Sequence, residues 1–250
     1  MGWEKGSGLS FAVLCFVFAT LAQGSIHGSI TTFLGKNLSQ DDDQASVTFE
    51  PSVTIGTKDN FTLTAYSLIN RPFNGFENFS VPKTALWATL PIITDVLVLH
   101  PSATLLGLDE WKAEGYMARW GVGVETVCTR APIRLSFRVT PFIQTNQFSQ
   151  RNDGTDLPRY GFSERLNAMV SFWHIELLAR LVMEQSYTGN WKNDYSIYEH
   201  AGYRMNERLL LGVSHELLSS VVDPTTGFYR EFRVFDSRAS RLSAFLQWVI

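Results

Sequence analysis

The ten residues RLSAFLQWVI, from Arg241 to Ile250, decide the fold. Successive side chains of a β-strand point to opposite faces, so every second residue of such a segment shares a face. One face then holds Leu242, Ala244, Leu246, Trp248 and Ile250, and the other holds Arg241, Ser243, Phe245 and Gln247. The first face is wholly apolar and the second is largely polar. The apolar face must therefore contact either a protein core or lipid.

The same two-residue alternation recurs through most of the chain. It is clear in ASVTFEPSVTI at residues 45–55, in IRLSFRVTPFIQT at 133–145 and in RLLLGVSHEL at 208–217. No stretch keeps the 3.6-residue apolar period of an amphipathic helix over three turns. The chain is therefore predicted to be all-β, with antiparallel strands.

Two classes of all-β protein share this alternation. Alternating segments of about ten residues, separated by turn residues, are typical of a transmembrane β-barrel. Soluble sandwiches and barrels also alternate. Aromatic residues near strand ends favour the membrane, because membrane barrels carry aromatic girdles at both interfaces. The candidate interface aromatics are Trp87, Trp111, Trp120, Trp173 and Trp248.

The N-terminal residues have the pattern of an export signal. Lys5 precedes an apolar run from Leu9 to Ala22, and small residues follow it. This pattern predicts a signal peptide over residues 1–24, cleaved after Gly24. Residues 25–44 are left as an extra strand or a flexible lead-in, and the barrel is predicted over residues 45–250. Beyond the signal only Cys128 remains, so an internal disulfide is excluded.

The whole plan resembles Gram-negative outer-membrane β-barrel proteins of the porin type. The signal peptide and the C-terminal strand with Leu242, Leu246, Trp248 and Ile250 carry the likeness. In that group the last strand is the assembly signal and commonly ends in an aromatic residue, whereas this chain has Trp248 two positions before Ile250. No motif selects a single family. The resemblance implies a bacterial outer-membrane location, with outer-membrane lipid, lipopolysaccharide and the barrel-assembly machinery as partners.

The number of strands is less well determined. Segments at 103–111, 227–236 and 240–250 are among twelve that alternate from residue 45 onward, and SIHGSITTFL at 25–34 is a further candidate. Bacterial barrels have an even number of strands, short periplasmic turns and longer outer loops. If the early segment is left out, the long connections fall on the periplasmic side, where short turns are expected. If it is included, the number of strands becomes odd. We therefore expect 10–12 strands and place the misassigned segment around Leu99–Trp111.

Arginine is unusually abundant among the cations and predicts a charged lumen. Fifteen of the 21 cationic side chains are arginine, and Arg134 and Arg138 share the polar face of their segment. Rings of charged side chains tune which ions pass a pore. The candidate pore-lining residues are Arg134, Arg138, Glu125, Arg165, Arg208, Glu216, Glu231, Arg233 and Arg241. The alternative is that these arginines pair with the glutamates and fill or stiffen a narrow barrel.

Other chemistries find little support in the sequence. The net charge of −3 gives no basic excess for nucleic acid. No metal-ligand spacing, phosphate loop or dinucleotide fingerprint indicates a metal or a cofactor. Ser214, His215 and Glu216 are adjacent but cannot form a triad, because neighbours in a strand face opposite ways. No histidine falls in the His-x-Ser-Asn pattern of outer-membrane lipid hydrolases, so the sequence predicts no enzyme and no catalytic residue.

The sequence thus predicts a passive outer-membrane channel for small hydrophilic solutes or ions, with an anion preference arising from lumen arginines. A non-conducting structural or adhesive barrel and a soluble secreted β-domain that binds a ligand are the alternatives. The oligomeric state is left open.

Overall fold

The computed structural model describes residues 25–37, 45–56, 61–72, 80–106, 116–150, 156–189, 191–220, 232–236 and 239–250. These residues form twelve β-strands. The strands are β1 (Ser25–Asn37), β2 (Ala45–Gly56), β3 (Thr62–Pro72), β4 (Ser80–Ile93), β5 (Leu97–Leu106), β6 (Tyr116–Arg130), β7 (Ile133–Asn146), β8 (Tyr160–Phe172), β9 (Ile175–Tyr187), β10 (Trp191–Asn206), β11 (Leu209–Ser220) and β12 (Ser240–Val249). Among the described residues, no helix combines the length and the apolar character needed to cross a membrane.

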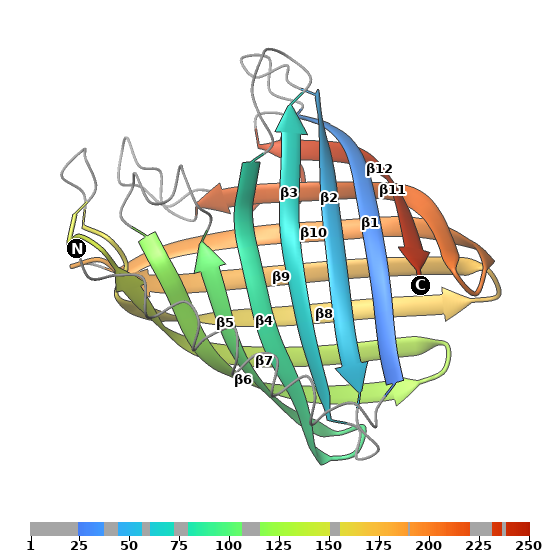
Figure 1. The fold of residues 1–250 in the computed structure, drawn as a ribbon, viewed down its shortest axis with the longest axis horizontal. Coiled ribbons are helices and arrows are strands. Elements are labelled where there is room, and N and C mark those ends of the chain that lie inside the picture. The colour runs from blue at the N-terminus through green and yellow to red at the C-terminus, as the bar shows by residue number, and fades with distance from the viewer. Residues whose placement is uncertain are drawn as a thin grey trace, which may run out of the picture.

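Each strand pairs in antiparallel fashion with its neighbours in the sequence, and β1 pairs with β12 to close the sheet (Figure 1). The closing register sets Phe33 opposite Phe245 and Ile30 opposite Trp248. Hydrogen bonds in both directions between Gly28 and Ile250 extend this pairing to the end of β12. The all-β, closed antiparallel barrel predicted from the alternation is confirmed, with a strand count of twelve.

The two rims of the barrel differ in their connections. One rim carries the short turns after β4, β6, β8 and β10, together with the start of β1 and the end of β12. The opposite rim carries the longer connections, including residues 147–159 between β7 and β8, together with the short connection at residues 188–190 between β9 and β10. Bacterial outer-membrane barrels place short turns on the periplasmic side and long loops outside. We therefore name these two ends the short-turn rim and the loop rim.

The outer wall is largely apolar, although Glu164, Glu199 and His215 also face outward, and it has aromatic residues near both rims. Outward side chains of β7 such as Leu135 and Phe137 are 46% and 45% exposed, although they are large and apolar. Near the loop rim the outward aromatics are Trp120, Tyr160, Tyr187 and Trp191. Near the short-turn rim they are Phe172, Trp173, Tyr203 and Trp248. An apolar band between two aromatic girdles is the exterior expected of a sheet that faces lipid.

The structure corrects two strand assignments. Around Leu99–Trp111, where the error was expected, the structure has the strand β5 (Leu97–Leu106), and residues 107–111 lie outside the described residues. The misassigned segment is 227–236, because its described part, 232–236, lies outside the strands. Its Phe232 and Val234 alternate with Arg233 as in a strand, but the rings of Phe232 and Phe235 pack against Tyr195 and His215 on the outer wall. The early segment at 25–34 lies in β1, so the total is even and the long connections fall on one rim.

Candidate functional site: the barrel lumen

The polar faces of the strands line the lumen, and ion pairs between non-adjacent strands establish this orientation. Arg119 on β6 donates to Glu184 on β9 at 2.8 and 2.9 Å, although β7 and β8 lie between these strands. Arg119 also donates to Gln144 at 3.3 Å. Its guanidinium carbon lies 4.1 Å from the centre of the Phe142 ring. Such contacts can form only on the concave face of the sheet.

A second charged group lies on β5, β6 and β7. His100 Nε2 lies 2.7 Å from a carboxylate oxygen of Glu125, and the Arg138 guanidinium donates to the same oxygen. The Glu125 residue is only 6% exposed. Because a buried carboxylate is stable only when it is paired, these two partners fix its position in the wall.

A third group lies toward the short-turn rim on β9 and β10. Glu176 accepts a hydrogen bond from Arg204 at 2.7 Å and lies 3.2 Å from His200 Nε2. The His200 ring packs against Phe245 with 5.2 Å between ring centres. Three clusters of arginine, carboxylate and uncharged polar groups therefore line the same side of the lumen at different depths.

Three inward-facing arginines of this wall, Arg134, Arg165 and Arg180, have no ion pair among the described residues. Arg165 on β8 lies directly opposite Arg138 in the strand register, and Arg180 on β9 lies opposite Asn167. Arg180 donates to the Asn167 side chain at 2.9 Å. Within the part of the chain that the structure describes, neither Arg165 nor Arg180 has a carboxylate partner within 4 Å. Like charges directly opposite each other across strands repel, and Glu125 and Glu50 act on Arg165 and Arg180 only from beyond ion-pair distance.

The facing part of the lumen is formed by β2, β3, β4 and β11. Tyr66 packs edge-on against Trp87 with 5.6 Å between ring centres, and Lys83 Nζ lies 5.7 Å from the centre of the Tyr66 ring. Lys83 and Arg165 repel each other electrostatically across the lumen. Glu50 interacts with both Glu216 and Arg180. Charged groups on the two walls are thus close enough for both walls to act electrostatically on a solute in the lumen.

The structure brings most of the predicted lining residues to the lumen. Inward-facing strand positions are held by Arg134, Arg138, Glu125, Arg165, Glu216 and Arg241. Arg241 reaches across β1 and donates to Ser46 at 2.7 Å and to Thr48 at 3.3 Å. Whether these residues select solutes stays a prediction.

Three of the predicted positions lie elsewhere, and two fall outside the described residues. Arg208 lies in the turn between β10 and β11, where its backbone N–H donates to Asn206. Arg233 belongs to segment 232–236, and its side chain is 60% exposed. Trp87 faces inward beside Tyr66 instead of lying at the membrane interface. Glu231 and Trp111 lie outside the described residues.

The sequence reading missed Arg119, Arg180, Arg204, Glu184 and Lys83 as lining residues. All of them stand on inward strand positions, so consistent application of the alternation to β4, β6, β9 and β10 could have found them. Their partners depend on the register between strands. Among the described residues, no group of three or more His, Cys, Asp or Glu side chains could hold a metal ion.

Comparison with solved structures places this architecture among outer-membrane channels. The NanC porin superposes with a TM-score of 0.56 at 10% identity, covering 89% of this chain and 98% of the porin. An outer-membrane channel from Pseudomonas putida F1 also gives a TM-score of 0.56, at 9% identity, covering 91% of this chain and 96% of that channel. The KdgM porin gives 0.51 at 10% identity, covering 88% and 98%. No protein-family model and no curated protein sequence matches this chain. The likeness therefore shows a shared fold, that of the outer-membrane porins.

Proposed function

We propose that this protein is a passive channel of the bacterial outer membrane for small hydrophilic solutes or ions, with a preference for anions. The fold supports the channel, because a closed sheet satisfies its backbone hydrogen bonds in lipid and surrounds a polar interior. The apolar outer wall and its two aromatic girdles support the membrane location. Lipopolysaccharide around the wall and recognition of β12 by the barrel-assembly machinery stay predictions from the resemblance.

The observation that carries the anion preference is the arginine group on β7, β8 and β9. Arg138 is neutralised by Glu125, whereas Arg165 and Arg180 have no carboxylate partner among the described residues. Guanidinium groups stay charged at every relevant pH and bind carboxylate or phosphate with a forked geometry. An excess of fixed positive charge in a narrow lumen raises the local concentration of anions. One structure with this fold is the KdgM porin in complex with disordered oligogalacturonate, and an acidic solute of that type fits the proposal.

Bilayer conductance tests this function. The refolded protein should give discrete ion steps in a planar bilayer, with a reversal potential in a salt gradient that favours chloride over potassium. Replacing both Arg165 and Arg180 by Ala should reduce the anion-to-cation permeability ratio about fivefold. This corresponds to about 1 kcal/mol, the interaction of two unit charges 4 Å apart in water.

The control is Arg130→Ala, which removes a single positive charge from an exposed position at the end of β6 and is compared with each single replacement, Arg165→Ala and Arg180→Ala. It should leave the permeability ratio unchanged. Conductance without ion selectivity would contradict the anion preference alone. The absence of ion steps from a folded, bilayer-inserted protein would contradict the channel itself and favour a structural barrel.

A further inference from the structure

The outer wall carries a row of polar side chains at a place where lipid contact would demand apolar residues. Glu199 on β10 lies directly opposite His215 on β11, and both face outward because Tyr198 and Glu216, which flank them, face the lumen. Ser240 begins β12 on the same outer face, opposite Leu217. Ionisable side chains on the lipid face of a barrel are destabilising, so such a row indicates a function.

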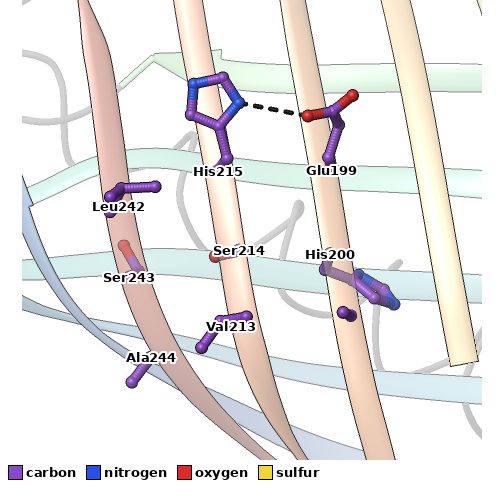
Figure 2. Close-up of a pocket in the computed structure, with 9 residues that line it drawn as sticks. Glu199, His200, Val213, Ser214, His215, Leu242, Ser243 and Ala244 are labelled. Atoms are coloured by element: carbon purple, nitrogen blue, oxygen red, sulfur yellow. Dashed lines mark hydrogen bonds and ion pairs between the residues drawn. The ribbon is translucent and has the colours of Figure 1, made fainter. Parts of the chain in front are cut away.

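Hydrogen bonds join the three side chains in one line. His215 Nε2 lies 2.9 Å from Ser240 Oγ, and His215 Nδ1 lies 3.4 Å from a carboxylate oxygen of Glu199. Figure 2 shows His215 and Glu199 side by side on adjacent strands, joined by this second contact. The order is hydroxyl, imidazole, carboxylate, with each ring nitrogen facing one partner.

The surroundings of Ser240 orient its proton toward the imidazole. The backbone N–H of Asp236 donates to Ser240 Oγ at 3.1 Å. Because the oxygen already accepts this bond, its own proton is free to be donated to His215 Nε2. The Nδ1–H then donates to Glu199, which holds the imidazole in the tautomer that a general base requires.

A groove lies next to this row on the outer wall. It has a volume of about 580 Å³ and a mainly apolar lining that includes His215 and Glu199. Val213, Leu242 and Ala244 supply apolar side chains on the outward face of β11 and β12 (Figure 2). This size and this lining suit a hydrocarbon chain. Leu242, which lines the groove, and Ser240 stand two residues apart on the same face of β12.

We propose that Ser240, His215 and Glu199 form a serine esterase site that cleaves acyl esters of membrane lipids. Ser240 Oγ attacks the ester carbonyl carbon and its proton passes to His215 Nε2. The bond to the leaving alcohol then breaks, and the same proton passes to that alcohol. Water releases the fatty acid from Ser240 by the reverse transfers. Ser240 and His215 are the catalytic residues, and Glu199 is a positioning residue for the imidazole.

Segment 232–236 lies against the hydroxyl, because the Asp236 N–H donates to Ser240 Oγ. Ser240 is only 2% exposed, and the Phe235 ring lies 5.7 Å from the His215 ring. The backbone of Arg233 holds this segment to the wall through the Tyr195 hydroxyl at 3.2 and 3.4 Å. An ester must displace this segment to reach Ser240. We therefore expect Phe235→Ala to speed the reaction.

An alkyl fluorophosphonate provides a direct test of the nucleophile. The refolded protein in detergent micelles should form a covalent adduct that peptide mass spectrometry maps to Ser240. Ser240→Ala should abolish the adduct, and His215→Gln should slow its formation at least about a thousandfold. Ser243→Ala, a lumen-facing position of the same strand, is the matched control and should label at the native rate. Circular dichroism and thermal unfolding verify that each variant is folded.

Fatty-acid release identifies the ester. Vesicles of phosphatidylethanolamine and phosphatidylglycerol form one arm, and vesicles containing lipopolysaccharide form the other; release in either arm names the lipid source. Glu199→Gln should lower kcat with KM unchanged, and Glu199→Asp should restore part of it. A native protein without an adduct at Ser240 overturns the proposal, as does release that persists in Ser240→Ala. If the adduct forms at Ser240 but neither kind of vesicle releases fatty acid, lipid esters are not the substrate. Channel conductance is measured in a separate experiment, so a negative result for the esterase does not contradict the channel, and a negative result for the channel does not contradict the esterase.

Discussion

Gly212 shows how tightly single residues are fitted inside the barrel. A Cβ atom at this position would lie 2.3 Å from the backbone oxygen of Ala201 and 2.7 Å from the Phe245 ring. The Phe245 ring fills the lumen wall between Phe33 and His200, so it cannot move away without disturbing both. Glycine is therefore required here by close approach.

We expect Gly212→Ala to lower the free energy of unfolding by about 1–3 kcal/mol, the usual range for overpacking a well-packed site. Urea unfolding in lipid vesicles, followed by tryptophan fluorescence, measures this change. Gly28→Ala is the matched control, because the nearest atom to its added Cβ lies 3.7 Å away. Equal stability losses in the two variants would show that backbone entropy, not crowding, decides the result.

Individual strands set which chemistry faces which side. In β8, Leu166 faces outward and is 49% exposed, whereas Ser163 faces the lumen opposite Glu184. The same strand thus presents a surface for hydrocarbon and a surface for water, and the two are separated only by the direction of the side chain.

We expect Leu166→Arg to destabilise the folded protein by about 2–4 kcal/mol, the cost of arginine near the bilayer midplane. Ser163→Arg should change stability far less, because the added charge lies in the lumen beside a carboxylate. Unfolding in lipid vesicles compares the two variants. A similar loss in both would contradict the assignment of the inner and outer faces.

The faces of single strands were predictable from the sequence, but the contacts between strands were not. Alternation placed Arg134 and Arg138 on the inner face of β7 because that strand is regular and flanked by turns. Alternation also excluded Ser214 and Glu216 as partners of His215, since both face the lumen. The partners that the structure supplies, Glu199 and Ser240, come from β10 and β12. Only the register of the closed sheet brings them together, and a single sequence does not contain that register.

At the scale of the whole molecule, closure of the sheet depends on β1. Its pairing with β12 and β2 leaves no free strand edge, and an open edge cannot be satisfied in lipid. The sequence left residues 25–44 undecided because Gly28, the serines and the threonines of this segment weaken its alternation. Segment 227–236 alternates more clearly, yet its described part covers the wall. The need to close the sheet, and not the strength of the alternation, explains why the early segment forms a strand and residues 232–236 do not.

A chain that begins at residue 45 should therefore fail to form a stable barrel, whereas a chain that begins at Ser25 should fold in detergent or lipid vesicles. Circular dichroism and resistance of the vesicle-inserted protein to protease provide the readouts. Native-like protease resistance of the shorter chain would mean that β2 and β12 can close the sheet without β1.

The first and last strands meet side by side, and Gly28 and Ile250 exchange hydrogen bonds at the short-turn rim. A short peptide linker could join these two ends, and the chain could then be opened at a turn elsewhere on the same rim. Such a circularly permuted protein would keep every strand neighbour while a different strand emerged last from the ribosome. Folding of this permuted protein would show that strand pairing alone determines the barrel. Failure to fold would show that the order in which the strands are synthesised also matters.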